Sequence, residues 1–287
     1  HSFMKDETIN RREFIIRGAA ATLAGTTAFS LLSAAKPRTS PMKTKPSDFS
    51  FIHLTDIHVR YKRKGDVGYR KCISTIKKLK QKPDLAIMGG DLAFDGNYTD
   101  KAEFIRSIEL YKTISDEMGI PYYNCLGNHD HLGYSSRRKC APDDPEIGKK
   151  CIMDRLGMKD SYYSFDHKGW HFVILDSAYP IETPTGPSQA VKLGKEQLEW
   201  LAYDLGAHHG MPTVACIHVA AFCEIGTHNG DKEFNPIKSG MVIEDTRELQ
   251  KILERHKVKA LLQGHSHMTE EYGFNGVWYI TTQSAGA

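Results

Sequence analysis

The chain has 287 residues, of which 40% are hydrophobic and 25% charged, enough apolar sequence to bury a substantial core in one α/β domain. Its net charge of +3 is small, and no basic stripe with interleaved aromatic residues appears. We therefore expect a globular enzyme and no nucleic-acid polymer as partner.

The N-terminal segment resembles an export signal. His1-Ser2-Phe3, ahead of Met4, is interpreted as an expression scar, and Arg11-Arg12 lies in a stretch similar to a twin-arginine signal. The apolar run that follows is roughly 15 residues long, shorter than the ~20 that a membrane span needs. It ends in Ser33-Ala34-Ala35, a pattern typical of a cleavage site.

Residues 1–35 are therefore predicted to be the scar and a signal peptide, and the Pro-rich residues 36–48 a linker. The prediction implies the twin-arginine export machinery as a partner of the precursor, a periplasmic or secreted product, and no membrane span in the mature protein. An ordinary amphipathic helix is the alternative for the apolar run. Residues 49–287 would form the catalytic domain; the chain stops soon after a strand, which is compatible with truncation at the C-terminus.

From Phe49 onward, strand and helix patterns alternate. Apolar runs predict strands at 49–54, 84–88 and 121–125, and helical spacing predicts helices around 73–79 and over 100–118, the latter capped by Thr99 or Asp100. Strand, helix, strand, helix and strand in this order indicate a mostly parallel sheet covered on its faces.

The second half of the chain begins with a polar, Gly- and Pro-interrupted segment, 131–161, predicted to be an insertion over the mouth of the site. A hairpin over 162–175 and a Pro- and Gly-rich loop to 194 follow. Later segments predict helices around 198–205 and 246–256, strands at 212–217 and 258–262, and a last hairpin over 271–282 that turns at Asn275-Gly276.

Seven oxygen and nitrogen donors directly follow the apolar strands: Asp56, His58, Asp91, Asn128, His218, His265 and His267. Such donors without thiolate suit a near-octahedral pair of divalent or mixed-valence transition ions such as manganese, iron or zinc. Two ions about 3.5–4 Å apart need a bridging carboxylate, and Asp91 is the natural candidate because it is central in the order. Gly127-Asn128 taken alone is also ordinary turn sequence.

Five short segments in this order resemble the motifs of the calcineurin-like metallophosphoesterase superfamily. They are Asp56-Ile57-His58, the segment from Gly90-Asp91 to Gly96, Gly127-Asn128-His129-Asp130, His218, and Gly264-His265-Ser266-His267. The resemblance covers Phe51 to His267. It implies a two-sheet α/β sandwich with a bimetal site at the carboxyl ends of its strands, and hydrolysis of a phosphate ester by a metal-bridging hydroxide.

The same resemblance implies roles for single residues. The first ion would be held by Asp56, His58, Asp91 and His267, and the second by Asp91, Asn128, His218 and His265. His129 would be the general acid. Asp95 would orient His129, although it lies four residues after Asp91 where many relatives have three. His218 is followed by Val219-Ala220-Ala221, where relatives often have a proline or a second histidine.

Three function classes remain open from the sequence. The first is a phosphodiesterase or phosphomonoesterase acting on a small phosphorylated substrate, with a nucleotide-derived compound as one option. The second is a phosphoprotein phosphatase, which export and the insertion both disfavour, and the third is a non-catalytic metal-binding scaffold, which the full ligand set disfavours. Export also predicts a disulfide between Cys140 and Cys151 within the insertion.

Overall fold

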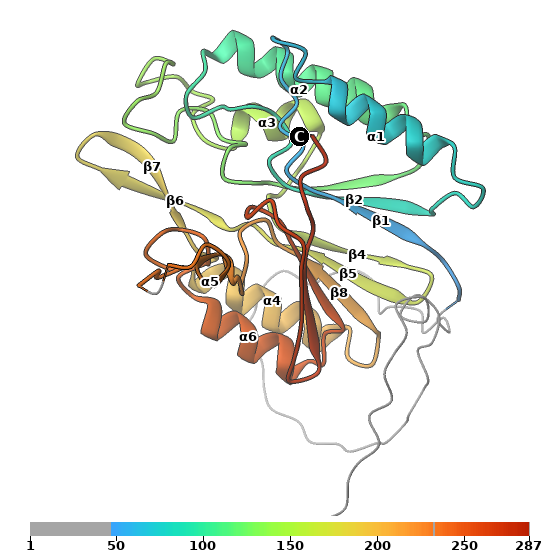
Figure 1. The fold of residues 1–287 in the computed structure, drawn as a ribbon. Coiled ribbons are helices and arrows are strands. Elements are labelled where there is room, and N and C mark those ends of the chain that lie inside the picture. Colours follow the sequence, from blue (N-terminus) through green and yellow to red (C-terminus); the bar gives the residue numbers. More distant parts are fainter. Residues whose placement is uncertain (1–46, 232, 287) are drawn as a thin grey trace, which may run out of the picture.

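The computed structural model describes residues 47–286 except residue 232. The predicted signal peptide and residues 36–46 of the predicted linker lie outside this part. Figure 1 shows four layers: two sheets packed face to face, with helices on both outer faces. The predicted two-sheet α/β sandwich is confirmed.

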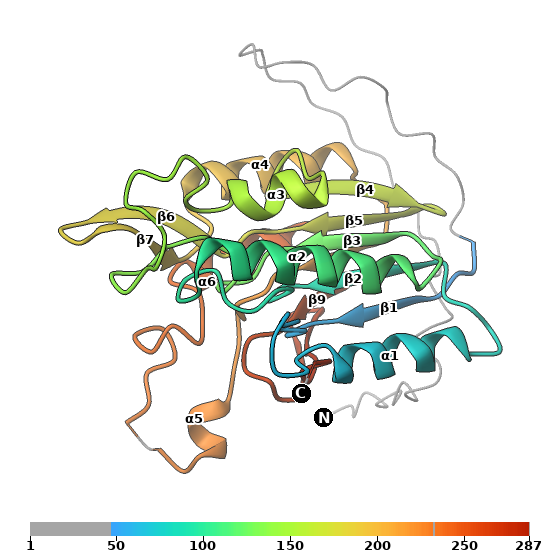
Figure 2. The same cartoon turned by 90° about the horizontal axis from the view of Figure 1, so that it is seen from above.

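The first sheet is parallel and has the order β1-β2-β3. Its strands are β1 (Phe51–Leu54), β2 (Leu85–Gly89) and β3 (Tyr122–Cys125). The crossover helices are α1 (Val67–Lys77) and α2 (Lys101–Asp116), which run side by side over the outer face in Figure 2. Asp100 is the N-cap of α2, where its side chain accepts a hydrogen bond from the Glu103 amide at 2.8 Å.

The second sheet has the order β10-β11-β9-β8-β5-β4. Its parallel centre consists of β5 (Trp170–Ile174), β8 (Thr213–Cys216), β9 (Ala260–Gln263) and β11 (Val277–Thr281). The antiparallel strands β4 (Tyr163–His167) and β10 (Glu270–Phe274) form its edges. Two helices, α4 (Lys195–Ala207) and α6 (Thr246–Arg255), cover its outer face.

The core follows from the alternation of side chains along the strands. All residues of β2 are buried. Leu85 and Ile87 pack between the two sheets with Phe172, whereas Ala86 and Met88 pack in the cluster beneath the helices. A strand buried on both faces shows a continuous apolar run, which is the signal that predicted it.

The structure confirms the hairpin at Asn275-Gly276, where both residues have positive φ, 49° and 81°, as a tight hairpin turn requires. The prediction of a loop over 176–194 is wrong in part, because β6 (Ala178–Thr183) and β7 (Gly186–Val191) form a separate two-stranded hairpin there. The sequence of β7, Gly-Pro-Ser-Gln-Ala-Val, lacks the apolar alternation that identifies strands.

Two short helices were not predicted. One is α3 (Lys150–Leu156), inside segment 131–161, which packs against α2. The other is α5 (Ile225–His228), in a loop that extends away from the sandwich in Figure 2. Among the described helices, none has the length and apolarity required to cross a membrane.

The predicted disulfide between Cys140 and Cys151 is wrong. All six cysteines lie in the described part of the chain and carry free thiols. Cys151 belongs to α3, where it is fully buried in the same apolar cluster as Ile152, and Cys140 packs against that cluster as a partly buried residue. The packing of α3 therefore uses the Cys151 side chain as a small apolar group.

Candidate dimetal centre

The seven predicted ligands converge at the edge where strands of both sheets end. Six of them form two groups, within each of which the candidate ligand atoms lie within 4.8 Å of one another. The first group is Asp56, His58 and His267, and the second is Asp91, His218 and His265. The six residues are grouped as the expected ligand sets would require, with the shared Asp91 in the second group, and Asn128 precedes His129, whose amide donates to Asp91 Oδ1.

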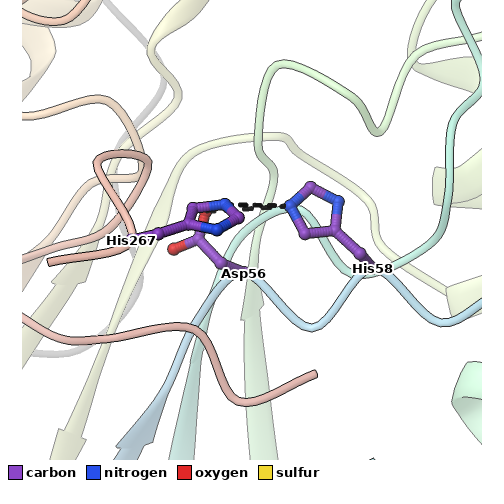
Figure 3. Close-up of side chains that lie close together, drawn as sticks. All are labelled: Asp56, His58 and His267. Carbon is purple, nitrogen blue, oxygen red and sulfur yellow. Dashed lines mark hydrogen bonds and ion pairs between the residues drawn. The ribbon is translucent and has the colours of Figure 1, made fainter. Parts of the chain in front are cut away.

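The first group brings together loops that follow β1 and β9 (Figure 3). His267 Nε2 lies 3.1 Å from Asp56 Oδ1 and 3.3 Å from His58 Nε2. Two imidazole nitrogens and a carboxylate oxygen that face one another this closely form a cluster of lone pairs unless a cation or protons lie between them. The other carboxylate oxygen, Asp56 Oδ2, accepts a hydrogen bond from the Thr55 hydroxyl at 2.9 Å.

In the second group, His218 is fully buried and its tautomer is fixed by the backbone. Its Nδ1 donates a hydrogen bond to the Gly89 carbonyl at 2.9 Å, so Nε2 points at Asp91 Oδ2, 3.1 Å away. A backbone carbonyl that holds the distal nitrogen of a histidine is the usual way to orient a metal ligand.

Asp91 stands between the two groups. Its Oδ2 lies 3.6 Å from His58 Nε2 of the first group and 3.1 Å from His218 Nε2 of the second. Burial, the largest single effect, would raise the pKa of Asp91, but the charges of His218, His129 and His58 and a hydrogen bond from His218 together hold it well below its usual range. An ionised carboxylate in this position can bridge two cations.

The residues present fit a pair of cations. His218 Nε2 and Asn128 Oδ1 are buried, and neither has a hydrogen-bond partner. Leaving a buried polar atom unsatisfied costs about 1–3 kcal/mol, which a bound ion or its water ligands would offset. Carboxylate, imidazole and amide groups also match the chemistry of borderline to hard divalent ions.

The backbone of Asn128 is held by two residues that the sequence did not indicate. Its carbonyl oxygen accepts hydrogen bonds from Asn97 Nδ2 at 2.7 Å and from Gln189 Nε2 at 2.8 Å. Gln189 belongs to β7, so the β6–β7 hairpin reaches the centre. Asn97 lies just after the motif that ends at Gly96, and Gln189 lies in no motif, so neither residue was predicted from the sequence.

The backbone at the centre is strained. Five of the candidate ligands have positive φ in the left-handed region, which non-glycine residues rarely adopt; these are Asp56 (53°), His58 (46°), Asp91 (51°), His265 (70°) and His267 (57°). Glycines allow the loops to approach, since a Cβ on Gly127 would lie 2.1 Å from Asp91 Oδ1 and one on Gly264 2.1 Å from the Thr55 hydroxyl. Strain concentrated on functional residues indicates loops shaped for ligand geometry.

Asp130, the last residue of the Gly127-Asn128-His129-Asp130 motif, ties two of these loops together. Its buried carboxylate accepts hydrogen bonds from the amides of Leu92 at 2.9 Å, Ala93 at 3.1 Å and Gly127 at 2.8 Å. It therefore fixes the loop after β2 to the loop after β3. Asp130 lies within the motif, but the motif alone does not predict this role.

His129 lies beside the centre with its side chain 31% exposed. Its amide donates to Asp91 Oδ1 at 2.9 Å, and its Nδ1 lies 2.9 Å from Asp95 Oδ2 in a contact poorly aligned for a hydrogen bond. Burial opposes the charged imidazole, but Asp95 and Asp91 outweigh burial and raise the pKa of His129 to about 9. The two carboxylates therefore favour the protonated form of His129.

Sequence comparison finds distant relatives that are named as phosphodiesterases. The chain is 26% identical over 226 residues to a probable cyclic nucleotide phosphodiesterase from Synechococcus sp., covering 76% of this chain and 73% of the relative. It is 23% identical over 256 residues to a probable glycerophosphodiester phosphodiesterase, GpdQ, from Arcobacter nitrofigilis, covering 81% and 77%.

The fold is also similar to a solved structure. A dimetal phosphatase from Danio rerio superposes with a TM-score of 0.58 at 14% identity, covering 83% of this chain and 88% of that one. The profile of the calcineurin-like phosphoesterase family matches residues 49–269, a range that contains all seven converging donors. Because this match covers most of the chain and all seven donors, the chain belongs to the calcineurin-like phosphoesterase family and is a metal-dependent phosphoester hydrolase.

Proposed function

We propose that this protein hydrolyses small phosphodiesters, with nucleotide-derived diesters as the preferred class. The observation that carries the proposal is the position of Asp91 between two groups of ligand atoms, with His129 beside it. The printed names of both relatives, a cyclic nucleotide phosphodiesterase and a glycerophosphodiester phosphodiesterase, support a diester substrate.

The pairing of Lys149 agrees with a diester substrate. A diester phosphate carries one negative charge, whereas a monoester approaches two at neutral pH. Lys149 raises the positive potential around His131 next to the site, but its ammonium group is already paired with the buried carboxylate of Asp176. This cation is therefore not free to neutralise the second charge of a monoester.

We assign the following roles to the residues of the site. Asp56, His58, Asp91 and His267 would hold one ion, and Asp91, Asn128, His218 and His265 the other. Two bound divalent ions, which we expect to be manganese, iron or zinc, supply an activated water molecule and neutralise charge on the phosphoryl oxygens. His129 would donate its proton to the leaving oxygen, with Asp95 holding Nδ1 so that Nε2 remains for the substrate.

The phosphoprotein alternative fits the structure less well. The β6–β7 hairpin contacts the centre through Gln189, and Arg138 joins this hairpin to segment 131–149 by donating to the Thr185 and Pro187 carbonyls at 3.0 and 2.9 Å. A hairpin held beside the ligands by these contacts favours a small substrate over a folded phosphoprotein.

The decisive experiment is a substrate panel with protein loaded separately with manganese, iron or zinc. We expect cyclic nucleotides and glycerophosphodiesters to be hydrolysed faster than nucleoside monophosphates, sugar phosphates and phosphopeptides. Asp91→Ala should lose both ions and all hydrolysis, while Asp154→Asn, a control on the exposed face of α3, should keep both. Faster turnover of monoesters or phosphopeptides, or full metal content in Asp91→Ala, would contradict the proposal.

The export prediction stays a separate proposal. Fusing residues 1–35 to a reporter that is active only outside the cytoplasm would test it. The reporter should be exported, and replacing Arg11-Arg12 by two lysines should stop export. Export that is unaffected by the double replacement would mean that another route or signal operates.

A further inference from the structure

A second cluster of histidine and aspartate side chains lies far from the dimetal centre, at the beginning of β5. We call it the β4–α4 cluster; it consists of Asp166, His171, Asp204 and His208. His171 pairs with Thr213 at the start of β8, five residues before His218, which corresponds to roughly 16 Å along an extended strand. Neither the proposed hydrolysis nor the dimetal centre uses these residues.

Three members of the cluster have candidate ligand atoms close together. Candidate ligand atoms of Asp166, His171 and His208 lie within 4.8 Å of one another. His171 Nδ1 lies 2.7 Å from Asp166 Oδ1, and the rings of His171 and His208 stack with centroids 3.8 Å apart. Each residue comes from a different element: β4, β5 and the C-terminal end of α4.

The fourth member, Asp204, orients both imidazoles. Its carboxylate oxygen Oδ2 lies 2.8 Å from His171 Nε2, and its backbone carbonyl accepts a hydrogen bond from His208 Nδ1 at 2.7 Å. A carbonyl only accepts, so the hydrogen of neutral His208 is on Nδ1 and its Nε2 carries a lone pair. Holding the distal nitrogen of each histidine by a carboxylate or a carbonyl is the arrangement found around metal-ligating histidines.

We propose that Asp166, His171 and His208 form a third metal site, for a borderline divalent cation of the zinc class. Two imidazoles and one carboxylate, with no thiolate, are a ligand set that zinc accepts, with water completing its coordination. An ion can enter from solution because the side chains of Asp166 and His208 are 40% and 19% exposed. His171 is completely buried and forms the floor of the site.

Binding is a proton exchange and needs no other reactant. The Nδ1 proton of His171, which faces Asp166, leaves to solvent as the ion takes its place. Metal affinity should therefore weaken as the pH falls. The bound ion would join the β4–β5 hairpin to the end of α4, next to the contact of 2.9 Å between the Ser164 hydroxyl and Asp204 Oδ1.

The alternative is that the cluster is only an ion pair. His171 would then be a permanent imidazolium between Asp166 and Asp204, with His208 stacked on it. In that case the cluster would bind no ion at micromolar concentrations. The two possibilities differ in the number of ions that each chain binds, which does not depend on activity.

The test is a zinc count by mass spectrometry on full-length protein, after dialysis against a micromolar zinc buffer. His208→Ala and Asp166→Asn should each bind one ion fewer per chain than the wild type. His209→Ala is the matched control, since His209 is the exposed neighbour of His208, and it should bind as many ions as the wild type. Hydrolysis of a nitrophenyl diester should be the same in all four proteins.

A thermal melt provides a second measurement. Excess zinc should raise the Tm of the wild type and of His209→Ala more than that of His208→Ala. Equal zinc contents in the wild type and in His208→Ala would overturn the proposal and leave the ion pair. An equal rise in Tm with zinc in these two proteins would overturn it as well.

Discussion

Among the residues of the site, His129 has the most specific proposed role, that of the general acid. It is the acid candidate because Asp95 and Asp91 keep it protonated, whereas burial and the charge of Lys149 lower the pKa of the neighbouring His131 to about 4. Positioned proton transfer contributes about 10²–10⁴-fold, and more for a basic leaving group. His129→Ala should therefore lose most activity on ribosyl or alkyl diesters and much less on a nitrophenyl diester.

Rates on the two kinds of diester, together with metal content, check this prediction. The variant should keep both ions, because no ligand is removed. Equal losses on both substrates with full metal content would make His129 a positioning residue. Loss of metal would place it among the ligands.

The contact between Asp95 and His129 predicts a change in pH dependence. The pKa of His129 is raised, so an acid that must be protonated stays active until the pH rises through that value. Asp95→Asn removes a carboxylate that raises it. We expect the basic limb of the kcat/KM profile to move to lower pH, with rates near those of the wild type well below the new limb.

A full pH profile of the metal-loaded variant is the measurement. A profile that keeps its shape and is only scaled down would show that Asp95 orients the imidazole without setting its pKa. Metal content serves as the control, because Asp95 is not among the residues whose ligand atoms form the two groups.

Site residues that lie within short sequence motifs could be predicted from the sequence. Site residues whose role depends only on tertiary contacts could not. All seven donors follow apolar strands, and parallel strands that end at one edge bring such residues together whatever lies between them. Asn97 and Gln189 hold the Asn128 carbonyl through tertiary contacts 31 and 61 residues apart in sequence. Nothing local distinguishes these two from ordinary loop and strand residues.

At the scale of elements, the segment after β11 is a support for the first ligand loop. It rises from the second sheet toward α1 in Figure 1. The Ser284 hydroxyl donates to the Asp56 carbonyl at 2.7 Å, and the Ala285 amide donates to the Thr55 carbonyl at 3.0 Å. Asp56 and His58 both have strained φ, so these contacts hold a conformation that the loop would otherwise leave.

Ser284→Ala should therefore weaken binding of the ion held by Asp56 and His58, and lower stability by about 1 kcal/mol, the usual net value of one hydrogen bond. Ser239→Ala is the matched control, since it removes a hydroxyl that donates to the Pro236 carbonyl at 2.9 Å in an exposed loop. Metal titration of both variants is the measurement. Equal affinities would show that the ligand loop keeps its shape unaided.

Elements with strong periodicity were predictable, and the β6–β7 hairpin was not. The buried strand β2 shows a continuous apolar run because both of its faces are covered. All of β7 is only partly buried, so its sequence carries no such pattern. Its strand character comes from pairing with β6, for example Pro180 opposite Gln189, which only the folded chain specifies.

At the scale of the whole molecule, the dimetal centre joins the two sheets. Asp56, His58, Asp91 and Asn128 follow strands of the first sheet, whereas His218, His265 and His267 follow strands of the second. The ions would therefore bind only where both sheets are in place. A ligand of this kind stabilises the folded state by mass action, because the unfolded chain does not assemble the site.

Removal of metal should consequently lower the melting temperature. At a free-ion concentration about 100-fold above Kd, binding of one ion stabilises by about 2.7 kcal/mol, which for a domain of this size corresponds to a Tm change of about 5–10 °C. A chelator should produce this drop in the wild type, and restored manganese or zinc should reverse it.

In Asp91→Ala the chelator should change Tm far less, because the shared ligand is absent. Both the parent protein and Asp91→Ala should carry His208→Ala in this comparison, so that metal binding at the β4–α4 cluster does not contribute to the change in Tm. If the chelator left the Tm of the metal-loaded parent unchanged, the two sheets would be held by their apolar interface alone, and the ions would serve catalysis without stabilising the fold.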